Sequence, residues 1–248
     1  MIPLTGKKVV VIGGSRGVGR QVVELAIRDG ARVLAVARQD GPLRQLAQEV
    51  PGAEILSLDA TDQAAPGKVF DVLQPDVLVL SAGALPPAAP LHEQNWEKFG
   101  VNWEADVKMA FHFCKAALTR PLAVGSSVIL ISSGAALQGS PISGGYAGCK
   151  RTQIFIQNYS QKESDRLGLG IRFMALAPRM MPDSDIGRHA VVGYSRYLGI
   201  TPAEFVQGME SPPTSFDVAN AAIELVTNPD PSKGNVFVVW GKGLEPVP

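Results

Sequence analysis

Residues 7–19 read KKVVVIGGSRGVG, an apolar run followed at once by a loop rich in glycine. The β-branched residues predict a buried strand over residues 7–12, because such side chains pack well on a pleated surface. Apolar residues at helical spacing then predict a helix over 17–28, and a second strand is predicted over 32–37. A strand, a glycine loop, a helix and a strand make a βαβ unit, which predicts a parallel sheet.

The same alternation continues along the chain, with proline and glycine at the joints. Further helices are predicted near 42–49, 62–73, 95–118 and 144–167, and further strands near 54–58, 77–80, 127–131, 171–175 and 235–240. These elements predict an α/β fold with a doubly wound, seven-stranded parallel sheet, helices on both faces, and one domain over residues 1–248.

The stretch 179–213 interrupts this alternation. It contains a helical pattern near 190–198, and Thr201 and Glu204 form a capping box with a proline between them. We interpret the stretch as a small helical lid over the carboxyl edge of the sheet, where ligands of such sheets bind. The alternative is that it only covers apolar surface.

Composition narrows the functional classes. The 23 basic and 23 acidic residues balance, so no electrostatic signature of nucleic acid or anionic membrane binding is present. Apolar runs fall short of the roughly 20 residues that a membrane helix needs. The apolar run at 9–12 leaves no room for a leader before it, and two cysteines without metal or redox spacing favour a cytoplasmic protein. The three histidines show no ligand pattern, so no metal site is expected.

The glycine loop predicts a nucleotide site. Missing side chains let the backbone approach a pyrophosphate, and the following helix N-terminus offers amide donors and a partial positive charge. The residues expected to contact the cofactor here are Gly13, Ser15, Arg16, Gly17, Val18 and Gly19.

The end of the second strand indicates which dinucleotide binds. An acidic residue there would bond the ribose hydroxyls of NAD, but this sequence has Ala37 followed by Arg38. Arg16 and Arg38 supply two guanidiniums for a 2′-phosphate. The sequence therefore favours NADP(H).

Tyr146 and Lys150 are four residues apart, so they share one face of the predicted helix. A free phenol has a pKa of about 10, and a fixed cation beside it lowers that pKa toward neutrality. The pair therefore indicates a phenol that can exchange a proton with a substrate. Ser132 and Ser133 precede this helix by about one loop.

Together these motifs resemble the short-chain dehydrogenase/reductase family, in its compact single-domain form with a Rossmann-like fold. The resemblance covers nearly the whole chain. It rests on the glycine spacing, on Asp59, on Ala82-Gly83, on Asn102, and on Ser133 standing thirteen residues before Tyr146-x-x-x-Lys150.

The resemblance implies roles for a catalytic set. Tyr146 would be the general acid in reduction and the base in the reverse direction, while Lys150 would lower its pKa and hold the nicotinamide ribose hydroxyls. Ser133 would orient the substrate oxygen, with Ser132 as a structural residue at the strand end. Asn102 would hold a water that connects Lys150 to solvent.

The resemblance also implies further cofactor contacts. Asp59 would accept from the adenine amino group beside the Ala60 backbone, and the segments at Ala82, Gly83 and Pro178 would approach the cofactor.

Some positions depart from the family pattern. Ile12 stands where Thr is usual and Ser81 where Asn is usual, which alters hydrogen bonds between the central strands. Arg179 replaces a glycine after Pro178; we expect it to point outward, the alternative being that it binds an anionic substrate or a phosphate. Ser184 is a candidate hydroxyl for the nicotinamide carboxamide.

The leading interpretation is an NADP(H)-dependent oxidoreductase that interconverts a small-molecule carbonyl compound and an alcohol. One alternative is a 3-oxoacyl thioester reductase, with Arg188 and Arg196 as candidate contacts for an acidic carrier. Another is a non-catalytic NADP(H)-binding sensor. By resemblance the protein is expected to be a homo-oligomer, a dimer or tetramer, that packs through the helices at 95–118 and 144–167.

Overall fold

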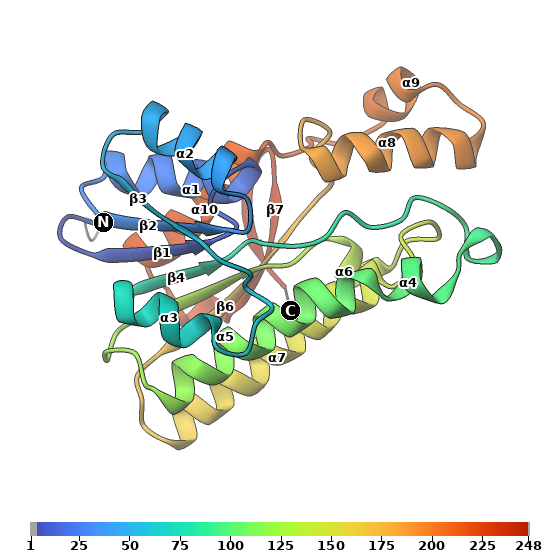
Figure 1. Cartoon of the computed structure of the whole chain (residues 1–248). Coiled ribbons are helices and arrows are strands. Elements are labelled where there is room, and N and C mark those ends of the chain that lie inside the picture. The colour runs from blue at the N-terminus through green and yellow to red at the C-terminus, as the bar shows by residue number, and fades with distance from the viewer. Residues whose placement is uncertain (1–3, 248) are drawn as a thin grey trace.

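The computed structural model describes residues 4–247 and has one eight-stranded sheet at its centre (Figure 1). The strand order is β3-β2-β1-β4-β5-β6-β7-β8, and the first seven strands in this order are parallel. The strands are β1 (Lys8–Ile12), β2 (Arg32–Ala37), β3 (Ala53–Ser57), β4 (Val77–Leu80), β5 (Ser127–Ile131), β6 (Arg172–Pro178), β7 (Val236–Trp240) and β8 (Gly243–Pro246). The doubly wound fold predicted from the sequence is confirmed.

The eighth strand was not predicted. The chain reverses after Trp240, and β8 pairs antiparallel with β7 from Trp240 opposite Gly243 to Phe237 opposite Pro246. Gly243 has a φ of 135°, a conformation that glycine adopts readily. A strand that includes a proline is tolerated at a sheet edge, because no further strand needs its missing N–H group. Because proline in a sequence argues against a strand, Pro246 made this strand difficult to predict.

Helices cover both faces of the sheet (Figure 1). They are α1 (Gly17–Arg28), α2 (Asp40–Glu49), α3 (Ala65–Val72), α4 (Trp96–Asn102), α5 (Lys108–Thr119), α6 (Ala135–Gln138), α7 (Tyr146–Arg166), α8 (Asp185–Leu198), α9 (Pro202–Gln207) and α10 (Ser215–Thr227), with short 3₁₀ turns at Leu91–Glu93 and Pro231–Lys233. Alternate residues of β1 divide the core: Val9 and Val11 pack on the side of α1 and α10, whereas Val10 and Ile12 pack on the side of α5 and α7. α10 was not predicted, although Thr214 and Asp217 form a capping box at its start.

The helix predicted over 95–118 is interrupted. It consists of α4, a π-helical turn over Trp103–Val107, and α5. A π turn inserts one residue into the α-helical hydrogen-bond ladder, and such turns often occur at functional sites. Here the turn contains Asp106, which is 1% exposed.

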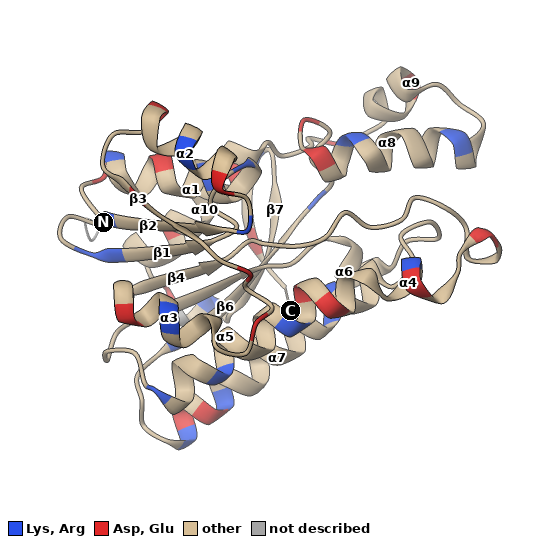
Figure 2. Cartoon of the chain, in the orientation of Figure 1, with Lys and Arg blue, Asp and Glu red and all other residues tan. Residues whose placement is uncertain are grey.

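The stretch predicted as a lid contains α8 and α9, which lie beyond the carboxyl ends of the strands (Figure 1). The capping box between Thr201 and Glu204 is present at the start of α9, as predicted. Figure 2 shows Lys and Arg interspersed with Asp and Glu along the helices, so neither sign of charge covers this view of the molecule. Among residues 4–247, no helix combines the length and the apolar character that crossing a bilayer requires.

Candidate active site

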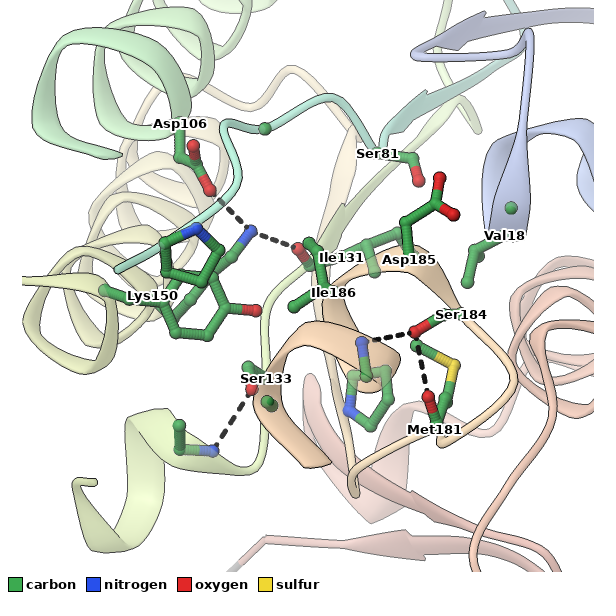
Figure 3. Close-up of a pocket in the computed structure, with 18 of the residues that line it drawn as sticks. Val18, Ser81, Asp106, Ile131, Ser133, Lys150, Met181, Ser184, Asp185 and Ile186 are labelled. Carbon is green, nitrogen blue, oxygen red and sulfur yellow. Dashed lines mark hydrogen bonds and ion pairs between the residues drawn. The ribbon is translucent and has the colours of Figure 1, made fainter. Parts of the chain in front are cut away.

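A cavity of about 760 Å³ lies at the carboxyl edge of the sheet. Its walls come from the segments that follow β1, β2, β3, β4, β5 and β6, together with the start of α7 and the lid (Figure 3). These segments meet because the carboxyl ends of parallel strands lie at one edge, where the strand order reverses on either side of β1. All predicted site residues except Gly19 and Asn102 line this cavity.

The glycine loop is closely packed where a side chain would not fit. A Cβ atom on Gly13 would lie 2.6 Å from the backbone nitrogen of Ala82, and one on Gly19 would lie 2.1 Å from the carbonyl oxygen of Gly13. Gly17 has a φ of 53°, and the space beside it is open. Gly13 and Gly19 thus let the loop pack against its neighbours, while Gly17 faces the open side on which a ligand would lie. These features fit a pyrophosphate held at the N-terminus of α1.

The two arginines predicted to contact a 2′-phosphate differ in their surroundings. Arg38 is exposed at the end of β2, where its carbonyl oxygen accepts a hydrogen bond of 3.1 Å from the Ser57 hydroxyl. Arg16 is also exposed, but its Nη1 lies 3.2 Å from Oδ2 of Asp185, the first residue of α8. The glycine loop is therefore joined to the lid by an ion pair that the sequence did not predict.

Asp59 follows β3 and turns its carboxylate onto its own loop. Its Oδ1 accepts from the Thr61 backbone N–H at 2.9 Å and from the Thr61 hydroxyl at 2.8 Å. These two donors, the backbone N–H first, hold the pKa of Asp59 below its usual value. Asp59 is exposed and Ala60 buried, and both line the cavity.

Tyr146 and Lys150 lie one turn apart at the start of α7, as their spacing predicts. Both side chains are largely buried, and the Lys150 ammonium lies 5.6 Å from the centroid of the Tyr146 ring. The ammonium is therefore close enough to act electrostatically on the phenol.

The Lys150 ammonium has three protein acceptors. Its Nζ lies 3.0 Å from Asp106 Oδ2, 3.1 Å from the Ile131 carbonyl oxygen and 3.1 Å from Gln153 Oε1; Figure 3 draws the first two contacts. Burial is the largest single influence and lowers the pKa of Lys150, but the Asp106 carboxylate, with smaller contributions from Tyr146 and Cys149, raises it by more, so this pKa lies above its usual value. Lys150 is thus a charged group in this site.

Sequence reasoning missed Asp106. Its Oδ1 accepts from the Ala84 backbone N–H at 2.9 Å and from the Asn102 side-chain amide at 3.2 Å. Asn102 is fully buried behind the cavity wall, and its amide also donates to the Ala84 carbonyl oxygen at 2.9 Å. The Asp106 carboxylate thus links the Asn102 amide to the Lys150 ammonium, and the water that the resemblance implies beside Asn102 stays a prediction. An acidic residue four positions after Asn102 was the available signal.

The two serines after β5 have different surroundings. Ser132 is buried, and its hydroxyl donates to the Lys150 carbonyl oxygen at 2.8 Å, in keeping with the structural role expected for it. Ser133 lines the cavity, and its Oγ accepts from the Ala135 backbone N–H at 3.2 Å (Figure 3). That contact leaves the Ser133 hydroxyl proton free to be donated into the cavity. Beside it, the Gly134 backbone N–H donates to the Pro178 carbonyl oxygen at 2.7 Å.

The sequence led us to expect that Arg179 points outward into solvent, but this expectation is wrong. Its side chain is half-buried and lines the cavity, and its guanidinium carbon lies 4.6 Å from the centroid of the Trp240 ring. Its Nη1 also lies 3.4 Å from Gln138 Oε1. A guanidinium stacks well on an indole face, so Trp240 holds the side chain along the cavity wall.

The lid contributes mostly apolar walls. Tyr194 stacks on Phe205 with ring centroids 5.3 Å apart, and its hydroxyl lies 2.5 Å from the Ser140 hydroxyl across the cavity. Ser184 caps α8 instead of remaining free for a ligand: its hydroxyl accepts from the Gly187 N–H and donates to the Met181 carbonyl oxygen, both at 2.9 Å (Figure 3). No cluster of three or more His, Cys, Asp or Glu side chains suited to a metal occurs among the residues described.

Comparison with known proteins agrees with this geometry. A family model described as short chain dehydrogenase matches residues 7–191. The short chain dehydrogenase/reductase AacuD of Aspergillus aculeatus is 28% identical over 221 residues, which cover 86% of this chain and 77% of that protein. Sorbitol dehydrogenase of Cereibacter sphaeroides is 30% identical over 183 residues, covering 71% of this chain and 70% of that enzyme.

A third relative, carbonyl reductase (NADPH) 2 of Sus scrofa, is 28% identical over 131 residues, and the match spans 52% of this chain and 54% of that protein. The family match covers the whole stretch from β1 into α8, including the glycine loop and α7. The chain therefore belongs to the short-chain dehydrogenase/reductase family of oxidoreductases, which use a nicotinamide cofactor.

Proposed function

We propose that this protein is an NADP(H)-dependent oxidoreductase that interconverts a ketone or aldehyde with an alcohol, with Tyr146 as the general acid or base. The observation that carries the proposal is the joint lining of one cavity by the glycine loop, Arg38, Ser133, Tyr146 and Lys150. A cofactor site and a proton-exchanging phenol are thus open to the same space.

The residues around the glycine loop fit the cofactor. Backbone N–H groups at the start of α1 would hold the pyrophosphate, and Gly13 and Gly19 give the loop the close packing that this requires. Arg38 would bind the 2′-phosphate, and β2 ends at Ala37 without the carboxylate that would repel it, while the nearby Asp40 pairs with Arg44. The name of the Sus scrofa relative also specifies NADPH. Asp59 would face the adenine end, and Pro178 would lie beside the nicotinamide. When bound, the nicotinamide supplies the hydride for carbonyl reduction.

The chain's own residues supply the proton and the orientation. The Tyr146 phenol would donate a proton to the carbonyl oxygen in reduction and accept one in oxidation. The charged Lys150 ammonium, 5.6 Å from the Tyr146 ring, favours the phenolate that forms after donation. Ser133 would donate its hydroxyl proton to the same substrate oxygen, since its Oγ lone pair is already used by the Ala135 N–H.

The lid favours a small, partly apolar carbonyl compound over an acyl thioester on an acidic carrier. Both arginines that were candidates for docking such a carrier are ion-paired: Arg188 with Asp185, and Arg196 with Glu93 at 3.6 Å. Charges that are already paired attract an acidic protein surface less strongly.

The test is NADPH oxidation with a panel of ketones and aldehydes by the wild type and by Tyr146→Phe. We expect at least about a hundredfold loss of kcat in Tyr146→Phe, the lower end of the usual general acid–base contribution. The control is Tyr159→Phe, which removes an exposed hydroxyl from the same helix and should leave kcat unchanged. Unchanged kcat in Tyr146→Phe would refute the proton-transfer role. Tight NADPH binding without turnover of any compound would instead favour the sensor.

A further inference from the structure

Asp106 and Lys150 form a buried ion pair at the wall of the proposed active site. Asp106 Oδ2 lies 3.0 Å from Lys150 Nζ, and the two side chains are 1% and 7% exposed. The Ile131 carbonyl oxygen and Gln153 Oε1 take up the other two directions around the ammonium. An ammonium has three donors, so all three are used by the protein, and Asp106 is the only one of these acceptors that carries a charge.

Burial gives this carboxylate a decisive effect on Lys150. An isolated ammonium inside a protein loses its proton readily, because the interior solvates the charged form poorly. The carbonyl of Ile131 and the amide of Gln153 offer only dipoles. The charge of Asp106 is therefore what keeps the amine protonated in this surrounding, and it does so at hydrogen-bond distance.

The surrounding chain is built to accept the carboxylate. A Cβ atom on Gly83 would lie 2.7 Å from Asp106 Oδ2, so only glycine leaves room for it there. The Ala84 N–H and the Asn102 amide bind its other oxygen, and the Gln153 amide donates to the Asp106 carbonyl oxygen at 3.0 Å. The π turn brings this residue inward, and four contacts from three segments fix it there.

We propose that Asp106 is a positioning residue of the oxidoreductase reaction: its carboxylate keeps Lys150 charged and holds the ammonium beside Tyr146. The effect on catalysis rests on the proposed function. The effect of Asp106 on the charge and position of Lys150 does not depend on it. Asp106 also contacts both the Asn102 amide and the Lys150 ammonium, one with each carboxylate oxygen. The connection from Asn102 to the ammonium is therefore a fixed side chain of this protein.

The titratable groups that face Lys150 are few. Among the residues that the structure describes, they are Tyr146 and Cys149 on α7 and Asp106 from the π turn. Burial raises the pKa of the Cys149 thiol to about 12, so Cys149 stays uncharged over the range in which an enzyme assay is run. The charge state of Lys150 near neutral pH therefore depends on Asp106.

The first test follows Lys150 itself by NMR in protein labelled with ¹³C at the lysine Cε, without cofactor or substrate. The Lys150 signal is assigned from its contact with the Tyr146 ring. In the wild type it should keep the protonated shift beyond pH 10.4, about the unperturbed lysine value. In Asp106→Asn, the midpoint of the Lys150 titration should fall by at least about one pH unit, which corresponds to a tenfold lower affinity of the amine for its proton.

The second test is the pH profile of NADPH oxidation with a ketone that the wild type reduces. Asp106→Asn should lower kcat about tenfold or more at pH 7 with little change in KM, and its deficit should widen toward pH 9 as Lys150 loses its proton. The matched control is Glu104→Gln: Glu104 lies in the same π turn, and the change breaks its exposed ion pair with Lys108, the first residue of α5. It should keep the wild-type profile.

A Lys150 signal that titrates at or below pH 10.4 in the wild type would overturn the inference, and this outcome can be observed even if Asp106→Asn does not fold. An identical Lys150 midpoint in the wild type and Asp106→Asn would overturn it as well. So would a wild-type pH profile in a folded Asp106→Asn enzyme. The proposed function is tested separately: it fails if Tyr146→Phe keeps its activity, whatever the charge state of Lys150.

Discussion

Arg16 in the glycine loop and Asp185 at the start of α8 lie 3.2 Å apart, from Nη1 to Oδ2, and both side chains are exposed. Asp185 also pairs with Arg188 on its own helix. Any phosphate that Arg16 binds must therefore compete with a carboxylate from the lid. Since exposed ion pairs contribute about 0 to 1 kcal/mol, this competition is mild and reversible.

The first prediction is that Asp185→Asn binds NADPH more tightly. Losing the carboxylate frees Arg16 for the 2′-phosphate, and an exposed pair of this kind limits the gain to about fivefold in Kd. NADH, which lacks that phosphate, should bind as before. The measurement is fluorescence titration of both cofactors. The control is Arg188→Gln, which leaves the Asp185 carboxylate in place for Arg16 and should therefore not tighten NADPH binding; weaker NADPH binding in Asp185→Asn would contradict the prediction.

Gly19→Ala should abolish cofactor binding and destabilise the fold. The added methyl would lie 2.1 Å from the Gly13 carbonyl oxygen, and backbone atoms have to move to relieve such a contact. We expect a loss of about 1 to 3 kcal/mol in the free energy of unfolding, the usual range for overpacking. Urea unfolding and NADPH titration measure the two effects. Gly67→Ala in α3 is the control, because nothing lies within 4 Å of its added methyl; equal stability of the two variants would contradict the prediction.

The features predicted most accurately from the sequence are those that residues close together along the chain determine. The glycine loop, α1 and β2 follow from one short stretch, and Tyr146 with Lys150 needs only helical spacing. Family resemblance then brought distant segments such as Asp59 and Ser133 to one edge of the sheet. Both line the cavity with Tyr146.

The sequence predicted least where a side chain's environment comes from distant segments. Asp106 reads as a polar residue on a regular helix until the π turn directs it at Lys150 on another helix. Arg179 reads as a surface cation because its partner Trp240 is some sixty residues away, on the neighbouring strand. Such pairs are set by packing across the sheet, and no local spacing encodes them.

Arg38→Ala should weaken NADPH binding and leave NADH binding unchanged. Hydrogen bonds to a charged group contribute about 1.5 to 3 kcal/mol, so Kd for NADPH should rise about ten- to a hundredfold. Arg44→Ala, which removes an exposed arginine paired with Asp40 in α2, is the control and should change neither affinity. The two cofactors are titrated under the same salt conditions, because phosphate contacts are screened. A wild-type preference for NADH would contradict the assignment of NADP(H).

The last prediction concerns self-association through α5 and α7. Aromatic side chains remain exposed on these two helices and the preceding π turn: Trp103, Phe111, Phe155 and Tyr159. Phe155 and Tyr159 stack with centroids 6.2 Å apart, and Arg151 lies over the Phe155 ring. Apolar side chains gathered on one exposed face commonly mark a contact with another chain. We therefore expect a dimer or tetramer that uses this aromatic face.

Phe155→Glu, made in a chain that also carries Arg151→Gln, should reduce the mass of the particle, because a second copy would have to bury a carboxylate that no longer has the Arg151 guanidinium as a partner. Sedimentation velocity at several protein concentrations measures this. Val124→Glu in the same Arg151→Gln chain is the control: it adds the same charge at an exposed valine in the loop before β5, outside the aromatic face. A monomeric wild type would contradict the prediction outright. An unchanged oligomer in the double variant would mean that the copies associate through another surface, since a carboxylate buried at this face without a partner would otherwise drive them apart.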